Sequence, residues 1–195
     1  MLTEKQIDRY ADVLLWGLKT ARTGRFKKYD IVCIRYNLPA IRLAEILYAK
    51  LLDMGMNPIP RMSLTSTMER SFFKLSNNKQ LVFPPPGDRE LFRNLNGNIF
   101  LHAPESITHL SDIDPKKIAK AAIAKKYLRD ILDRREEKGV FGWTLCTFPT
   151  KELARHARLS LKEYTNQIVK ACFLNKTSPV STWQTIYKNA VLIKL

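Results

Sequence analysis

The chain has 195 residues, of which 45% are hydrophobic and 26% charged, so it is long enough for a globular core and is unlike disordered, collagenous or coiled-coil proteins. The chain has 33 lysine and arginine residues against 18 acidic residues, which gives a net charge of +15. This charge indicates an acidic partner: nucleic acid, an anionic membrane, or an acidic half of the same protein that is missing from this chain. Three scattered cysteines argue against a disulfide framework, and no apolar run is long enough to cross a membrane, so we expect a reduced, cytoplasmic protein.

The first segments carry clear periodic patterns. A helix keeps its apolar spacing as far as Leu18 and ends at Gly24. The run Ile31–Ile34 is apolar and rich in β-branched residues, which is typical of a parallel strand buried on both faces. A second helix begins around Pro39 and ends at Gly55, because proline suits a first helical turn and glycine a C-cap.

The middle of the chain is less regular. The segment 56–64 contains two prolines, which cannot donate to a ladder, so it is predicted to be an edge strand. Residues 65–75 are predicted to be helical, and Asp88 is expected to cap a short helix that reaches Leu95. The apolar segment 97–103 is predicted to be a third strand.

The remaining elements begin with strong signals. Asp114 and Pro115 are the cap and first residue of the longest predicted helix, which ends at Gly139. A fourth strand is predicted over 141–148, and Thr150 can cap the helix that follows it. Two further helices are predicted beyond it.

This alternation predicts an α/β fold with a mainly parallel sheet of about four strands, flanked by helices. Residues 1–150 are expected to form the α/β domain. Residues 151–195 are expected to form an all-helical C-terminal segment that packs on it.

Common catalytic motifs are absent from the sequence: it holds no glycine-rich phosphate loop, no G-x-S-x-G elbow and no H-E-x-x-H. His102 and Glu105 lie where the third strand ends, and the carboxyl ends of parallel strands are where such folds place sites. An acid–base pair is therefore conceivable there. A strand-end histidine beside a loop glutamate is the commoner case.

Three other features have simpler interpretations. Glu152 and His156 are four residues apart on a helix, and ion pairing explains them better than metal binding, which needs three ligands for zinc catalysis. Cys33 and Cys146 lie in apolar strands and are expected to be buried and inert.

The predicted helix over 116–138 is strongly basic in its first half, which opposes the helix dipole. A bound anion would explain this charge, and a solvated face explains it more simply. The pattern has no interleaved aromatic residues of the kind that bind single-stranded nucleic acid.

The last third of the chain carries the most distinctive motifs. A strand end of the type Trp-Thr-x-x-x-Phe-Pro-Thr is followed by an alanine-containing helix and then by Ser178-Pro-x-x-x-Trp. This order resembles the aminopeptidase T family, the thermophilic-type metalloaminopeptidases, although the family has aspartate at the position of Ser178. The residues that carry the resemblance are Trp143, Phe148, Pro149, Thr150 and Trp183, of which we expect Trp143, Phe148 and Pro149 to pack in the core.

The resemblance implies a metal-dependent peptide hydrolase with zinc or cobalt, whose members are longer than this chain. Their metal ligands lie in a C-terminal half, and no ligand motif of that half is found here. We therefore expect the N-terminal domain of an aminopeptidase, inactive alone, with no catalytic, cofactor or metal residues. The implied partners are the missing catalytic half, peptide substrates and a second copy in a homodimer, whereas nucleic acid and membrane are not expected.

Two other functions are compatible with the residues. One is a stand-alone basic module that binds nucleic acid or another polyanion, with steeply salt-dependent binding. The other is a small-molecule enzyme that uses His102 at the edge of the sheet.

Overall fold

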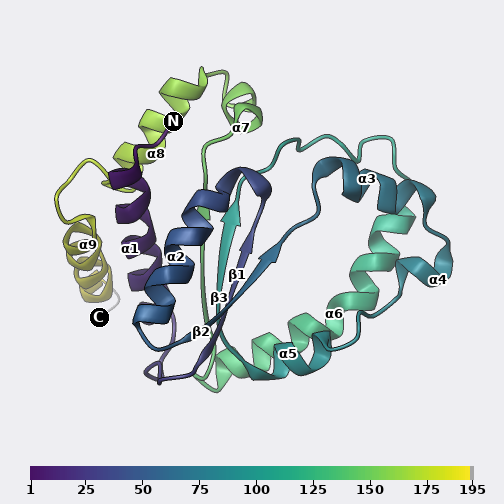
Figure 1. Ribbon diagram of the computed structural model, residues 1–195, viewed down its shortest axis with the longest axis horizontal. Helices are drawn as coiled ribbons and strands as arrows, with labels where there is room; N and C mark the ends of the chain where they lie inside the picture. The colour runs from purple at the N-terminus through teal and green to yellow at the C-terminus, as the bar shows by residue number, and fades with distance from the viewer. Residues whose placement is uncertain (194–195) are drawn as a thin grey trace.

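The computed structural model describes residues 1–193 and shows an α/β fold (Figure 1), which confirms the predicted fold class. All four strands are parallel and lie in the order β2-β1-β3-β4. Their bounds are β1 (Ile31–Tyr36), β2 (Asn57–Met62), β3 (Leu95–His102) and β4 (Gly142–Thr147). The proline-containing strand β2 is at an edge of the sheet, as predicted.

Helices connect the strands and extend the chain beyond the sheet. Most were predicted, but the four-residue α4 was not. Their bounds are α1 (Glu4–Thr20), α2 (Ile41–Asp53), α3 (Ser66–Leu75), α4 (Asn78–Leu81), α5 (Asp88–Asn94), α6 (Pro115–Glu137), α7 (Lys151–His156), α8 (Leu161–Ala171) and α9 (Pro179–Ile193), with a 3-10 turn at Leu38–Ala40. None of the helices within residues 1–193 is long and apolar enough to cross a membrane.

The main core lies between the sheet and helices α1 and α2, which cover the same face (Figure 1). Strands β1 and β3 supply Val32, Ile34 and Ile99 to this core, and none of the three is accessible to solvent. Because every second residue of a strand points to the same face, this pattern assigns the intervening residues to the opposite face.

The second face is covered only in part. Helix α5 and the C-terminal half of α6 pack over the beginnings of the strands, around Cys33, Leu95 and Phe141 (Figure 1). The N-terminal half of α6 packs instead against α3 and α4, through Phe73 and Ala121. The cover of this face therefore becomes thinner towards the carboxyl ends of the strands.

Two local predictions need correction. Helix α1 ends at Thr20, and Gly24 lies in the following segment, where its amide donates to the carbonyl of Gly139. Asp88 does not cap α5, because Gly87 is the cap residue at φ +84°, a left-handed conformation that suits glycine. Asp88 instead is buried and pairs with Arg61 at 2.6 Å.

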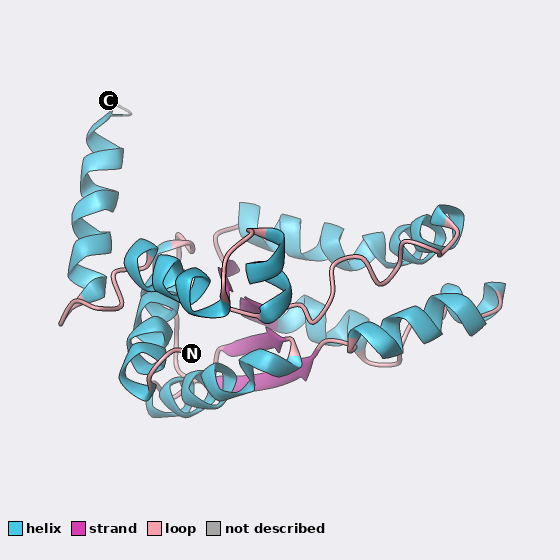
Figure 2. Ribbon diagram, turned by 90° about the horizontal axis from the view of Figure 1, so that it is seen from above, coloured by secondary structure: helices cyan, strands magenta, loops and turns pink. Residues whose placement is uncertain are grey.

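The helices after β4 contact the main core through α8 and the residues that follow it. Val169 and Leu174 are buried beside α1, and the Arg9 guanidinium donates to the carbonyl of Leu174 at 3.0 Å. Helix α9 stands away from the body of the molecule (Figure 2). It contacts α1 through Trp183 and Tyr187, which both lie against Trp16; the Trp183 ring stacks on that of Trp16 with ring centroids 6.4 Å apart.

Candidate functional site

The strand order places a topological switch point between β1 and β3. Connections from these neighbouring strands leave towards opposite edges of the sheet, and ligands of such folds bind outside the carboxyl ends at this point. Asn37 bridges the two strand ends here. Its Oδ1 accepts from the Ala103 amide at 2.9 Å, and its own amide donates to the carbonyl of Leu101 at 3.3 Å. Asn37 thus holds this edge together with one side-chain and one backbone hydrogen bond.

The structure places His102 at this edge but does not join it to Glu105. The imidazole lies on the second face of the sheet, with its ring centroid 5.8 Å from that of Phe100. Glu105 is exposed in the following loop. Within residues 1–193 no hydrogen bond or ion pair connects the two side chains, so an acid–base role for them stays a prediction.

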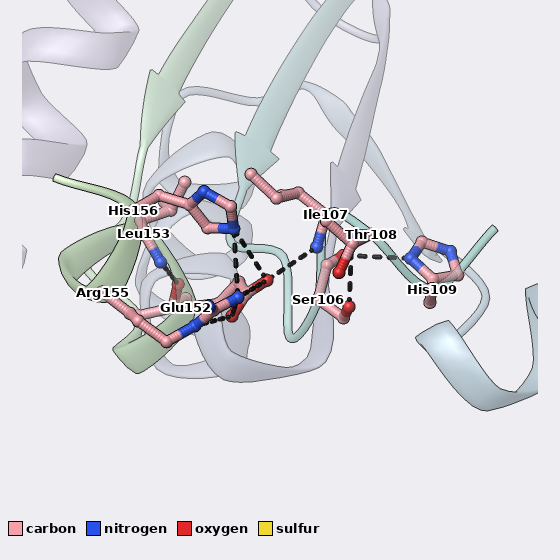
Figure 3. Close-up of polar contacts among 9 residues, drawn as sticks. Ser106, Ile107, Thr108, His109, Glu152, Leu153, Arg155 and His156 are labelled. Atoms are coloured by element: carbon pink, nitrogen blue, oxygen red, sulfur yellow. Dashed lines mark hydrogen bonds and ion pairs between the residues drawn. The ribbon is translucent and has the colours of Figure 1, made fainter. Parts of the chain in front are cut away.

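Glu152 fastens the loop after β3 to α7 (Figure 3). Its Oε1 accepts from the Ile107 amide at 3.1 Å, and its carboxylate also pairs with Arg155 at 3.0 Å and His156 at 3.3 Å. The Ile107 amide, followed by the neighbouring guanidinium, lowers the pKa of Glu152. The predicted contact between Glu152 and His156 is present, while the contact to Ile107 was not foreseen.

His109 fastens the same loop to α3. Its Nδ1 lies 3.1 Å from the carbonyl oxygen of Ser106 (Figure 3). Its Nε2 lies 2.8 Å from a carboxylate oxygen of Glu69, on α3. The two residues are 40 positions apart. No local pattern in the sequence could have indicated this contact.

A divalent metal has no fitting set of ligands in this part of the protein. Across the residues that the structure describes, no group of three or more histidine, cysteine or acidic side chains converges. His109 and His156 are each used in a separate ion pair. Two-metal hydrolysis needs several such ligands around ions about 3.5–4 Å apart, so these residues do not suit the chemistry.

The strand cysteines are buried, as predicted. Burial raises the pKa of Cys33 to about 11 and that of Cys146 to about 12. Both thiols are therefore protonated at neutral pH. A protonated, inaccessible thiol is a poor nucleophile.

The motif residues at the end of β4 have different surroundings. Phe148 packs against the main core, and Thr150 caps α7 by accepting from the Leu153 amide at 3.2 Å. Pro149 between them is half-buried. Trp143 is not in the core as expected, because it lies on the thinly covered second face; it is 45% exposed, and its indole donates to Glu136.

Trp183 has an aromatic environment made by residues far apart in sequence. Besides stacking on Trp16, it contacts Phe173 edge-on with centroids 5.8 Å apart. Its buried Nε1 has no hydrogen-bond partner among the described residues. Beside it, a hollow of about 530 Å³ lies between α1, α2 and α9, with Asp12, Trp16 and Lys50 in its wall.

The basic start of α6 has an internal explanation. Lys117 donates to the carbonyl of Phe73 at 3.0 Å and approaches that of Ser76 at 3.4 Å, both near the C-terminal end of α3. Lys120 donates to the side chain of Asn78 at 2.9 Å. Cations favour the negative end of a helix dipole, so Lys117 stabilises the C-terminal end of α3, and part of this charge is used within the fold rather than on an external anion.

Comparison with known proteins places this fold in a family. The chain is similar to wild-type AmpT from Thermus thermophilus, with 17% sequence identity and a TM-score of 0.64, and the similarity covers 93% of the present chain. It spans only 44% of the AmpT chain. No curated protein sequence matches it. The sequence model of the family described as thermophilic metalloprotease (M29) matches residues 3–194, so the chain belongs to this family, in agreement with its aminopeptidase T-like motifs.

Proposed function

We propose that this chain is the α/β part of a metal-dependent aminopeptidase, which removes N-terminal residues from peptides, and that the metal site lies outside residues 1–193. The observation that carries the proposal is the family match over 3–194 in a chain whose histidines do not converge with other ligands. Zinc or cobalt would be held by another part of the enzyme. The present part would shape the substrate cleft and would be inactive alone.

Helix α9 carries exposed apolar side chains, which support a contact with such a further part. Ile186, Val191 and Leu192 are 42%, 44% and 67% exposed. Exposed apolar side chains on a helix that stands away from the body of the molecule suit a contact with a partner. In this proposal residues 1–150 form the α/β unit, and residues 151–195, of which 194–195 lie outside the described residues, belong to a helical extension that leads to the catalytic part. The free cysteines support a cytoplasmic location.

The test is hydrolysis of aminoacyl-anilides by the purified chain, with zinc, with cobalt and with a chelator. We expect no metal-dependent release of the aniline and no stoichiometric binding of metal in equilibrium dialysis. Activity should appear when a separately expressed catalytic half is added. Metal-dependent hydrolysis by the chain alone, abolished by His109→Gln or His156→Gln, would refute the proposal.

A further inference from the structure

One row of side chains crosses the entire second face of the sheet near its carboxyl edge. The strand register places Arg61 beside Arg35, Arg35 beside Phe100, and Phe100 beside Leu145. These four residues, one from each strand, are called the open row here. They alternate with the buried residues Ile34, Ile99 and Cys146 of the main core, so they point away from α1 and α2.

Apart from Arg61, which pairs with Asp88 at the start of α5, the open row lies beyond the cover that α5 and α6 provide. Cys33, two residues before Arg35, is buried under these helices, whereas Arg35 is exposed and Leu145 is 52% exposed. Trp143, on the same face of β4, is also half-exposed. Parallel sheets ordinarily have both faces covered, and this one is uncovered beside its switch point.

The charge of the open row is unbalanced. Like charges on directly opposed residues of neighbouring strands destabilise a sheet, and Arg61 faces Arg35. Asp88 neutralises Arg61 at 2.6 Å, but within the described part of the chain Arg35 has no ion pair. Its guanidinium lies 5.1 Å from the centroid of the Phe100 ring. An acidic group from outside would resolve this repulsion.

We infer that the open row is a docking surface for a polypeptide segment that carries both acidic and apolar side chains. Its acidic side chains would pair with Arg35, and its apolar side chains would cover Phe100 and Leu145. The inference goes beyond the proposed function, because it requires neither metal nor hydrolysis.

Other occupants fit this surface less well. A second copy of the chain would bring another +15 charge and the same two arginines to the contact. A nucleic acid strand binds through free aromatic faces, whereas Arg35 already lies over Phe100, and Leu145 is aliphatic. Electrostatic and apolar complementarity together favour an acidic polypeptide.

The test is fluorescence anisotropy with a labelled peptide of alternating glutamate and leucine residues. We expect saturable binding that Arg35→Glu weakens by about tenfold or more, because a like charge then opposes the ligand. Leu145→Asp should weaken it similarly. The matched control is Lys5→Glu, which makes the same charge change at an exposed position of α1 and should leave the affinity within about twofold. Arg35→Gln, which removes only the charge, provides a second variant if Arg35→Glu does not fold.

Three results would overturn the inference. One is equal weakening by Arg35→Glu and Lys5→Glu, which would mean that only the net charge attracts the peptide. Another is tighter binding of a single-stranded oligonucleotide that depends on Arg35. The third is self-association of the chain that Leu145→Asp abolishes, without any binding of the peptide.

Discussion

The buried ion pair between Arg22 and Asp30 lies in the segment that connects α1 to β1, and its removal tests how strongly this segment stabilises the fold. The Arg22 Nη1 lies 2.7 Å from Asp30 Oδ2, and the two side chains are only 5% and 13% exposed. The same oxygen accepts from the Lys27 amide at 2.9 Å. Burial, and after it the charge of Arg22, lowers the pKa of the neighbouring Arg135. Asp30→Ala would thus leave Arg22 buried without a counter-ion beside a second guanidinium.

The expected loss of unfolding free energy is about 3–5 kcal/mol, the usual cost of removing one partner of a buried pair. A loss of about 4 kcal/mol changes the unfolding equilibrium roughly a thousandfold. With a urea dependence of roughly 2 kcal/mol per molar, the midpoint would fall by about 2 M. Arg22→Met combined with Asp30→Ala should recover most of the loss, because no buried charge remains.

The assay is urea unfolding followed by circular dichroism. Glu4→Ala is the control, since it breaks the exposed pair with Arg42 and should leave the midpoint unchanged. The reasoning fails if Asp30→Ala costs less than about 1 kcal/mol. It also fails if the double variant is as unstable as the single one, which would assign the role of Asp30 to the Lys27 amide.

Further predictions concern packing, protonation and capping. Gly142→Ala should lower the unfolding free energy by about 1–3 kcal/mol, because its Cβ would lie 2.8 Å from that of Arg22; an unchanged thermal midpoint would contradict this. The native pKa values of Cys33 and Cys146, about 11 and about 12, exceed those of unfolded thiols. The native state therefore retains protons that the unfolded state loses, so stability should fall as pH rises above roughly 8.5. Cys146→Ala should reduce that slope in urea midpoints measured against pH. Lys117→Met should cost about 1 kcal/mol and accelerate hydrogen exchange in the last turn of α3, since the helix loses its cationic cap; unchanged exchange would show that the cap is unimportant.

Most helices and strands could be predicted, because apolar periodicity, capping residues and β-branched runs each involve only a few neighbouring residues. The β-branched run Ile31–Ile34 is the centre of β1, and Asp114 caps α6 by accepting from the Lys116 amide. Helix α4 was missed because its four residues are too few to show apolar periodicity. Its signal was the capping box of Asn77 and Gln80, which is present in the sequence.

Contacts between distant residues could not be predicted in the same way. The pairing of Asp88 with Arg61 competes with the capping role that its position suggested. The alignment of Arg35 with Leu145 requires the strand order and register, and both depend on how four separate segments pair. The sequence showed the excess positive charge, but only the fold shows where part of it is left without a counter-ion.

The contacts of α1 also determine when this chain can complete its core during synthesis. The Tyr10 hydroxyl donates to the carbonyl of Thr147, 137 positions later in the chain. The Arg9 guanidinium donates to the carbonyl of Leu174, 165 positions later. Helix α1 is therefore synthesised long before these partners and is among the last elements to complete its contacts. Until then its apolar stripe is available to chaperones or to other nascent chains, since chains with such long-range contacts fold slowly and expose apolar surface meanwhile.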